Sequence, residues 1–148
     1  MRWIAVAALV ASLPSLLAAQ ATPDRVPVNP SGSPVGPFTP AIKTMGGLIW
    51  VSGQIGNAPG TRTIVPGGVA AEARQALENL GRVLEAAGSS YARVVKCTVF
   101  LTDINDWAAV NTVYAPFFPT DPPARSAVAV AGLVFGAHVE FECVAVGS

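Results

Sequence analysis

Apolar and polar positions along this chain follow two periods, one typical of strands and one typical of helices. Alternation with a period of two, together with frequent β-branched residues, predicts strands at residues 48–55, 93–103, 126–130 and 138–146. One further short strand is predicted within a turn-rich segment, near residues 62–65. Apolar residues three or four positions apart predict two helices, at residues 69–87 and 107–117.

Each predicted helix has an apolar stripe and a signal for one of its ends. The stripe of the first helix is Ala73, Leu77, Leu80 and Leu84. Gly88 follows this helix, where a C-terminal cap is expected. Asn105 or Asp106 is expected to cap the second helix. Its stripe is Trp107, Val110, Tyr114 and Phe117.

The order of these elements is β, β, α, β, α, β, β, which predicts an α+β domain with its helices on one face of a sheet. The opposite face is also apolar, because Val94, Phe100, Val144 and Val146 are expected to lie there. A large apolar face is rarely left in water, so the pattern favours self-association through it.

The first 40 residues differ from the rest in composition. Residues 1–21 begin with Met1-Arg2, continue with an apolar run and end in a small-x-small sequence, which is typical of a signal peptide. A retained N-terminal anchor is the alternative. Residues 22–40 contain six prolines and are interpreted as an extended leader, which leaves residues 41–148 as the folded domain. We therefore expect an exported protein, periplasmic or secreted, without a membrane span after cleavage.

Composition and charge exclude some classes of function. The chain has 148 residues, of which 51% are hydrophobic and 12% are charged. Arg2 is the only charge in residues 1–21, so cleavage leaves eight Lys/Arg and nine Asp/Glu, a net charge of −1. Nucleic-acid binding requires clustered cations that displace counterions, so this balance argues against a nucleic-acid partner.

The two cysteines, Cys97 and Cys143, lie in separate predicted strands. Their spacing has no metal-site signature, so no metal is expected. Two buried free thiols are favoured over a cross-strand disulfide, although an exported chain can keep such a bond.

Three charges interrupt the apolar C-terminal segment: Arg125, Glu140 and Glu142. The two glutamates share one strand face, and ionised carboxylates there are costly unless they are paired. One interpretation is an Arg–Glu salt bridge at a subunit interface. The other is a small anionic site, in which Arg125 binds a substrate carboxylate and Glu140 handles a water or a proton. Proximity to Glu142 would raise at least one glutamate pKa, which suits proton transfer.

Other polar residues give weaker signals. His138 is interpreted as a strand-end or surface histidine rather than a catalytic one. Ser52 has no histidine near it in sequence, so a nucleophilic serine is not expected.

Six segments, taken together, resemble one known family, the RidA family. This family is also called YjgF and is often labelled endoribonuclease L-PSP. The segments are GPF (36–38), VSGQIG (51–56), GGVAAEARQALENLGRVLEAAG (67–88), VVKCTVFLTDINDWAAVNTVYAPFF (94–118), PARS (123–126) and VEFECVAV (139–146). They occur in the family's order and spacing, from about Pro34 to Val146.

The resemblance implies a chorismate-mutase-like α+β fold with a mixed sheet and two helices on one face. It also implies a homotrimer whose sheets form a central barrel, with clefts between subunits. The implied activity is hydrolysis of 2-imino or 2-enamino acids to 2-oxo acids and ammonia, without a cofactor. Arg125 matches the arginine that binds the carboxylate, and Glu140 matches the glutamate that positions water. Ser52, Gly53 and Asn111 match residues that line the cleft.

Three positions depart from the family's usual pattern. Phe38 replaces a tyrosine that follows "GP" in many members, so a hydroxyl is missing. Ala127 replaces a cysteine that follows "RS" in several members, although its backbone could still contact substrate. The sequence GLVFG (132–136) replaces the usual "LP" turn at the rim of the cleft.

Two further functions are open at this point. The first is a trimeric module that binds small carboxylates through Arg125 without turnover. The second is an endoribonuclease, which rests on the family label alone and is disfavoured by the near-neutral charge.

Overall fold

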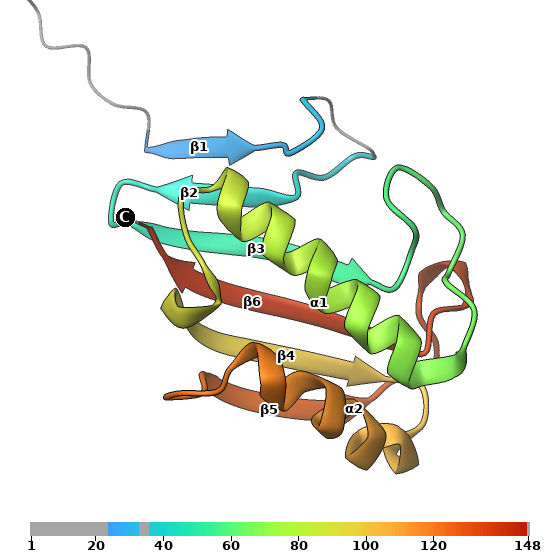
Figure 1. The fold of residues 1–148 in the computed structure, drawn as a ribbon. Coiled ribbons are helices and arrows are strands. Elements are labelled where there is room, and N and C mark those ends of the chain that lie inside the picture. Colours follow the sequence, from blue (N-terminus) through green and yellow to red (C-terminus); the bar gives the residue numbers. More distant parts are fainter. Residues whose placement is uncertain (1–23, 33–35, 148) are drawn as a thin grey trace, which may run out of the picture.

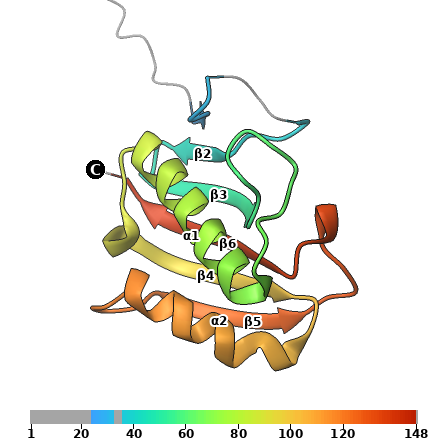
Figure 2. The same ribbon diagram turned by 45° about the vertical axis from the view of Figure 1, so that its right-hand side comes forward.

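A six-stranded mixed sheet carries two helices on one of its faces (Figures 1 and 2). The structure, a computed structural model, describes residues 24–32 and 36–147. The strands are β1 (Arg25–Val28), β2 (Ala41–Thr44), β3 (Leu48–Ile55), β4 (Val94–Leu101), β5 (Ala124–Ala129) and β6 (Val139–Val146). Their order across the sheet is β1-β2-β3-β6-β4-β5, in which only β4 and β5 pair in parallel. The α+β class and the helices on one face are confirmed.

Helix α1 (Gly68–Ala86) lies across the middle of the sheet and supplies much of its core (Figure 1). All four residues of the predicted stripe are fully buried: Ala73, Leu77, Leu80 and Leu84. The helix ends as predicted, because Gly88 has a φ of 74° and Ser89 N donates to Leu84 O at 2.8 Å. A left-handed residue at this position favours glycine, since only glycine adopts it without a steric penalty.

Helix α2 (Trp107–Tyr114) is shorter than predicted and continues as a 3-10 turn over Ala115–Phe117. Val110 and Tyr114 are buried, as the stripe predicted, but Trp107 is 48% exposed. The stripe fails at this first residue of α2, which follows directly on a 3-10 turn over Ile104–Asp106. Asp106 stands at the N-cap position of α2, one of the two residues expected there, but its side chain makes no capping hydrogen bond. The side-chain cap belongs to the 3-10 turn instead, where the Asp103 carboxylate accepts from Asn105 N at 2.9 Å.

The N-terminal part of the sheet differs from the sequence expectation. Strand β2 was not predicted. Strand β1 was not predicted either: it lies inside residues 22–40, which were interpreted as an extended leader, and it pairs with β2. Pro27 in β1 is compatible with pairing because β1 is an edge strand, where one missing N–H can face solvent. The strand predicted near residues 62–65 is reduced to one isolated bridge between Asn57 and Ile64. The predicted signal peptide lies outside the described residues.

The face of the sheet opposite the helices is partly apolar and open to solvent in the single chain. Phe100, Val144 and Val146 lie on it as expected, and Trp50 is 51% exposed there. Val94 was assigned to this face wrongly. A register shift between Val94 and Lys96 turns the Val94 side chain into the core, where it is buried.

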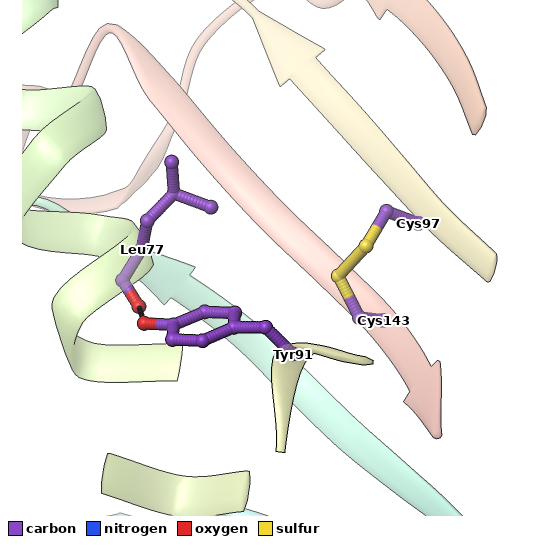
Figure 3. The surroundings of a disulfide bond; sticks show 4 residues. All are labelled: Leu77, Tyr91, Cys97 and Cys143. Atoms are coloured by element: carbon purple, nitrogen blue, oxygen red, sulfur yellow. Dashed lines mark hydrogen bonds between the residues drawn. A yellow bond between two sulfur atoms is a disulfide. The ribbon is translucent and has the colours of Figure 1, made fainter. Parts of the chain in front are cut away.

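Cys97 and Cys143 form a disulfide between β4 and β6 (Figure 3). The expectation of two free thiols is therefore wrong. The two cysteines are register partners on antiparallel strands, so both side chains leave the same face of the sheet a short distance apart. Both are buried in the core on the helix side. The sequence did not show that β4 and β6, which are separated by α2 and β5, are neighbours.

Removal of this disulfide should destabilise the fold without changing its topology. We expect Cys97→Ala/Cys143→Ala to lower the free energy of unfolding by about 2–4 kcal/mol, because the bond closes a loop of 46 residues in the unfolded chain. Alanine avoids the unpaired buried hydroxyl that serine would leave. Denaturant titration measures the change. A reductant should produce the same loss in the wild-type protein and none in the double variant. Equal free energies of unfolding for the oxidised wild type and the double variant would contradict this.

Candidate functional site

Arg125 lies on β5, at the edge of the sheet, and its side chain points to the helix side. Its register partner on β4 is the buried Cys97, so the two side chains share a face. Arg125 Nη2 donates a hydrogen bond to Asn111 Oδ1 at 2.5 Å, and the guanidinium carbon lies 4.5 Å from the centre of the Tyr114 ring. Both partners belong to α2. The helix therefore holds this cation in place from one side.

Arg125 lines a hollow of about 350 Å³ between α2 and the loop before β5. Its walls are Asn111, Tyr114, Ala115, Phe118, Pro122, Pro123 and Arg125. Ala127 follows two residues along β5 on the same face and packs against the core. A cation at an apolar wall is suited to bind a small carboxylate, because competing water is partly excluded.

Tyr114 is buried under Arg125, and its hydroxyl oxygen has no hydrogen-bond partner among the described residues. Burial raises the pKa of Tyr114 to about 12, although the neighbouring Arg125 charge acts in the opposite direction. The ring is therefore neutral at physiological pH. Sequence reasoning placed Tyr114 in the apolar stripe of the helix but missed its contact with Arg125.

Glu140 lies on β6, with its side chain on the face opposite the helices. Its neighbours Val139 and Phe141 are fully buried on the helix side, and Glu140 is the register partner of Phe100. The Glu140 carboxylate occupies the space above Gly53, where the Cβ atom of any other residue would overlap it. Gly53 lies at the irregular pairing of β3 with β6. Glycine at this position therefore makes room for the carboxylate.

Ser52 precedes Gly53 on β3, and Phe38 precedes the two residues that Ser52 holds. Ser52 Oγ donates to Thr39 O at 2.7 Å, and Ser52 N donates to Pro40 O at 2.9 Å. These two bonds fasten the segment that contains Phe38 to β3, next to Gly53. The Phe38 side chain is 52% exposed. The hydroxyl of Ser52 makes a structural contact with the backbone of Thr39.

The environment of Glu140 destabilises its charged form relative to that of an ordinary glutamate. Burial raises the pKa of the Glu140 carboxyl above its ordinary value, and the negative charge of Glu142 raises it further. Glu142 shares the face of Glu140 and is exposed, opposite Thr98. Within the described part of the chain, neither glutamate forms an ion pair. Glu140 can therefore exchange a proton closer to neutral pH than an ordinary glutamate.

Arg125 and Glu140 do not meet within one chain. Arg125 and Cys143 are both register partners of Cys97, and Glu140 lies three residues from Cys143 along β6. Two strand spacings across and three residues along put the Cα atoms of Arg125 and Glu140 roughly 14 Å apart. Their side chains also leave opposite faces of the sheet. The single chain thus carries two half-sites: an arginine half-site (Asn111, Tyr114, Arg125, Ala127) and a glutamate half-site (Ser52, Gly53, Glu140).

A second buried carboxylate, Glu72 on α1, was missed by sequence reasoning. Glu72 Oε2 accepts a hydrogen bond from His138 N at 2.8 Å. Glu72 Oε1 lies 2.7 Å from His138 Nδ1. The side chain of His138 is 55% exposed, which confirms a surface position at the start of a strand. In the described part of the chain, no three His, Cys, Asp or Glu side chains gather as a metal site. In residues 24–32 and 36–147, no helix has the length and apolarity of a membrane span.

The fold and the two half-sites define a class of small α+β proteins with a charged hollow suited to small carboxylates. A sequence profile of the family described as Endoribonuclease L-PSP matches residues 29–147. The chain belongs to this family, the RidA or YjgF family.

Individual relatives agree with this assignment. A 2-iminobutanoate/2-iminopropanoate deaminase from the goat Capra hircus is 48% identical over 112 residues, which cover 76% of this chain and 81% of the relative. The crystal structure of the yeast protein YEO7 is 41% identical, with a TM-score of 0.78, over 84% of this chain and 99% of that one. Escherichia coli TdcF with bound serine is 37% identical, with a TM-score of 0.75, over 83% and 99% of the two chains.

The effect of Glu142 on Glu140 can be measured by titration. We expect Glu142→Gln to lower the pKa of Glu140, because one negative charge on the same face is removed. A raised carboxyl pKa in the folded state favours folding at low pH, and this contribution is lost as the pH rises through that pKa. Glu142→Gln should therefore reduce the loss of stability that occurs as the pH rises through the pKa of Glu140. The measurement is the carboxyl ¹³C shift of Glu140 against pH.

Glu85→Gln is the matched control, because Glu85 is an exposed glutamate on α1. This variant should leave the titration of Glu140 unchanged. An unchanged Glu140 pKa in Glu142→Gln would show that burial alone sets it.

Proposed function

We propose that this protein hydrolyses small 2-imino and 2-enamino acids to 2-oxo acids and ammonia. The observation that carries this proposal is the pair of half-sites. One half-site has a fixed guanidinium that opens into a hollow, and the other has a half-buried carboxyl with a raised pKa. A substrate with a carboxylate next to an imine carbon needs both groups.

Arg125 binds the substrate carboxylate through the N–H groups that Asn111 does not occupy. Glu140, as the carboxylate, orients a water molecule toward the carbon of the protonated imine (C=NH2⁺). It takes up one proton of that water as the C–O bond forms and the C=N π electrons move to nitrogen. The resulting carbinolamine has a tetrahedral carbon with one hydroxyl and one amino group. Glu140 then passes the proton to the nitrogen. The C–N bond breaks, ammonia leaves, and the hydroxyl loses its proton to give the 2-oxo acid.

A complete site requires two copies of the chain, since one chain keeps Arg125 and Glu140 apart on opposite faces. Joining the arginine half-site of one copy to the glutamate half-site of the next is a heterologous contact, which closes into a ring. The exposed Trp50 and Val128 on the open face favour burial in such an assembly. We propose the homotrimer that the family resemblance implies, with one site at each interface.

Similar proteins support a small carboxylate substrate. The goat relative is named for its action on 2-iminobutanoate and 2-iminopropanoate, and the E. coli structure holds serine, an amino acid with a carboxylate. RNA is a poorer candidate. The chain has nine Lys/Arg against nine Asp/Glu, which supplies no excess of positive charge for a polyanion.

The assay measures release of 2-oxobutanoate from freshly generated 2-iminobutanoate. We expect Arg125→Ala to lower kcat/KM roughly a hundredfold, because two charge-assisted hydrogen bonds are lost. Glu140→Gln should lower kcat about 10²–10⁴-fold, because proton transfer is lost. Arg74→Ala, on the exposed side of α1, is the control and should retain full activity. Calorimetric binding of 2-oxobutanoate by the wild type without any turnover would instead identify a carboxylate-binding module.

Mixed assemblies test whether the site is shared. Arg125→Ala and Glu140→Gln chains, co-expressed in equal amounts, should assemble at random. About a quarter of the interfaces then combine an intact Arg125 with an intact Glu140, so about a quarter of wild-type activity should return. Each variant alone stays inactive. If the mixture were as inactive as its components, the shared site would be wrong.

We further propose that the protein is exported and is periplasmic or secreted. The sequence of residues 1–21 has the features of a signal peptide, and a buried disulfide is typical of oxidising compartments. Expression of the full chain in a bacterial host, followed by fractionation and intact mass measurement, tests this. We expect a periplasmic or extracellular product that begins after Ala21. A full-length product in the cytoplasmic fraction would contradict it.

A further inference from the structure

We infer that Tyr114 is a positioning residue that holds the guanidinium of Arg125 in the orientation required to bind a carboxylate. This inference rests on the proposed function of Arg125, and it concerns a residue that itself need not touch the substrate. The property that matters is the face of the aromatic ring, not the hydroxyl group.

The two contacts of Arg125 constrain it in different ways. Asn111 accepts from Nη2 and fixes the rotation of the guanidinium within its plane. The Tyr114 ring, 4.5 Å from the guanidinium carbon, fixes the position of that plane through cation–π attraction. Asn111 and Tyr114 are three residues apart, so they lie on the same side of α2. Together they leave the remaining N–H groups of Arg125 free to face the hollow.

The hydroxyl group of Tyr114 does not explain why an aromatic residue is needed. Its oxygen is buried and has no hydrogen-bond partner among the described residues, which is a cost to the fold. Tyr91 shows the ordinary arrangement, since its hydroxyl donates to Leu77 O at 2.6 Å (Figure 3). Phenylalanine at position 114 would therefore keep the useful ring face and remove an unpaired group.

The ring of Tyr114 is itself held firmly. Its centre lies 4.4 Å from that of Phe118 and 6.0 Å from that of Phe141, and these two rings stack on it with interplanar angles of 30° and 22°. Phe141 is a fully buried residue of β6. The stack extends from the core to the guanidinium, so Arg125 rests on a rigid surface. An arginine that is already ordered loses less conformational entropy when it binds a ligand.

Two substitutions separate the ring from the hydroxyl. Tyr114→Phe should keep KM for 2-iminobutanoate within about twofold and keep or raise Tm. Tyr114→Leu should raise KM roughly tenfold, while kcat changes less than about threefold, because Glu140 is untouched. Tyr91→Phe is the matched control, since it loses a satisfied hydroxyl and should lower Tm without changing KM. A Tyr114→Leu protein with wild-type KM would overturn the inference.

Fluorinated phenylalanines at position 114 keep the shape of the ring while they weaken its negative face, so they test the inference even if Tyr114→Leu does not fold. We expect KM to rise steadily with each added fluorine. The same series at Phe117, which packs against Tyr91 and does not line the hollow, should leave KM nearly constant. If KM did not depend on fluorination at position 114, the ring face would have no role in binding.

A measurement that needs no turnover separates this inference from the proposed function. The Nε–H signal of Arg125 in NMR spectra should show an ordered side chain and a ring-current shift in the wild type and in Tyr114→Phe. Both properties should be lost in Tyr114→Leu. If Arg125 stayed equally ordered in Tyr114→Leu, the inference would be wrong. If Arg125 lost its order there but the wild type neither bound 2-oxobutanoate nor hydrolysed the imine, only the proposed function would fail.

Discussion

The alternation of side chains along a strand is the constraint on which the rest of this structure depends. Odd-numbered residues of β6, such as Phe141 and Cys143, build the core under the helices, so Glu140 must leave the opposite face. On β5, the register with β4 sends Arg125 to the helix side. One sheet therefore cannot bring these two charges together. A small substrate that needs both would have to bind where two copies meet, and the partly apolar open face of the sheet supports the assembly proposed above.

Glu140 shows how the position of a carboxyl group in a fold can raise its pKa. The irregular pairing of β3 with β6 brings Gly53 under the carboxylate, so the group sits close to backbone rather than in water. Its burial disfavours the charged form, and Glu142 on the same face adds repulsion. The two glutamates that interrupt an apolar strand thus have different roles: one carries the proposed chemistry, and the other adjusts its acidity.

Local patterns in the sequence were sufficient for α1, for its glycine end and for the strands β3, β4, β5 and β6, because each depends on residues close together in the chain. Errors arose where distant segments decide the outcome. The edge strand β1 was not predicted, because it contains Pro27. A register shift turns Val94 into the core. The two cysteines expected as free thiols form a disulfide, because β4 pairs with β6. The separation of Arg125 from Glu140 depends on strand order and could not be deduced from their spacing.

The two half-sites are stabilised in different ways, and the difference follows from strand position. Glu140 lies on β6, an inner strand of the sheet. On one side of it the Glu72 carboxylate accepts a hydrogen bond from His138 N, and on the other side Cys143 forms the disulfide. The backbone of Glu140 is therefore fixed on both sides, and the space above Gly53 is enough to place its carboxylate. Arg125 lies on β5, an edge strand with one unpaired side, and its long side chain has many rotamers. That half-site needs support from side chains, and α2 supplies it through one amide and one aromatic ring.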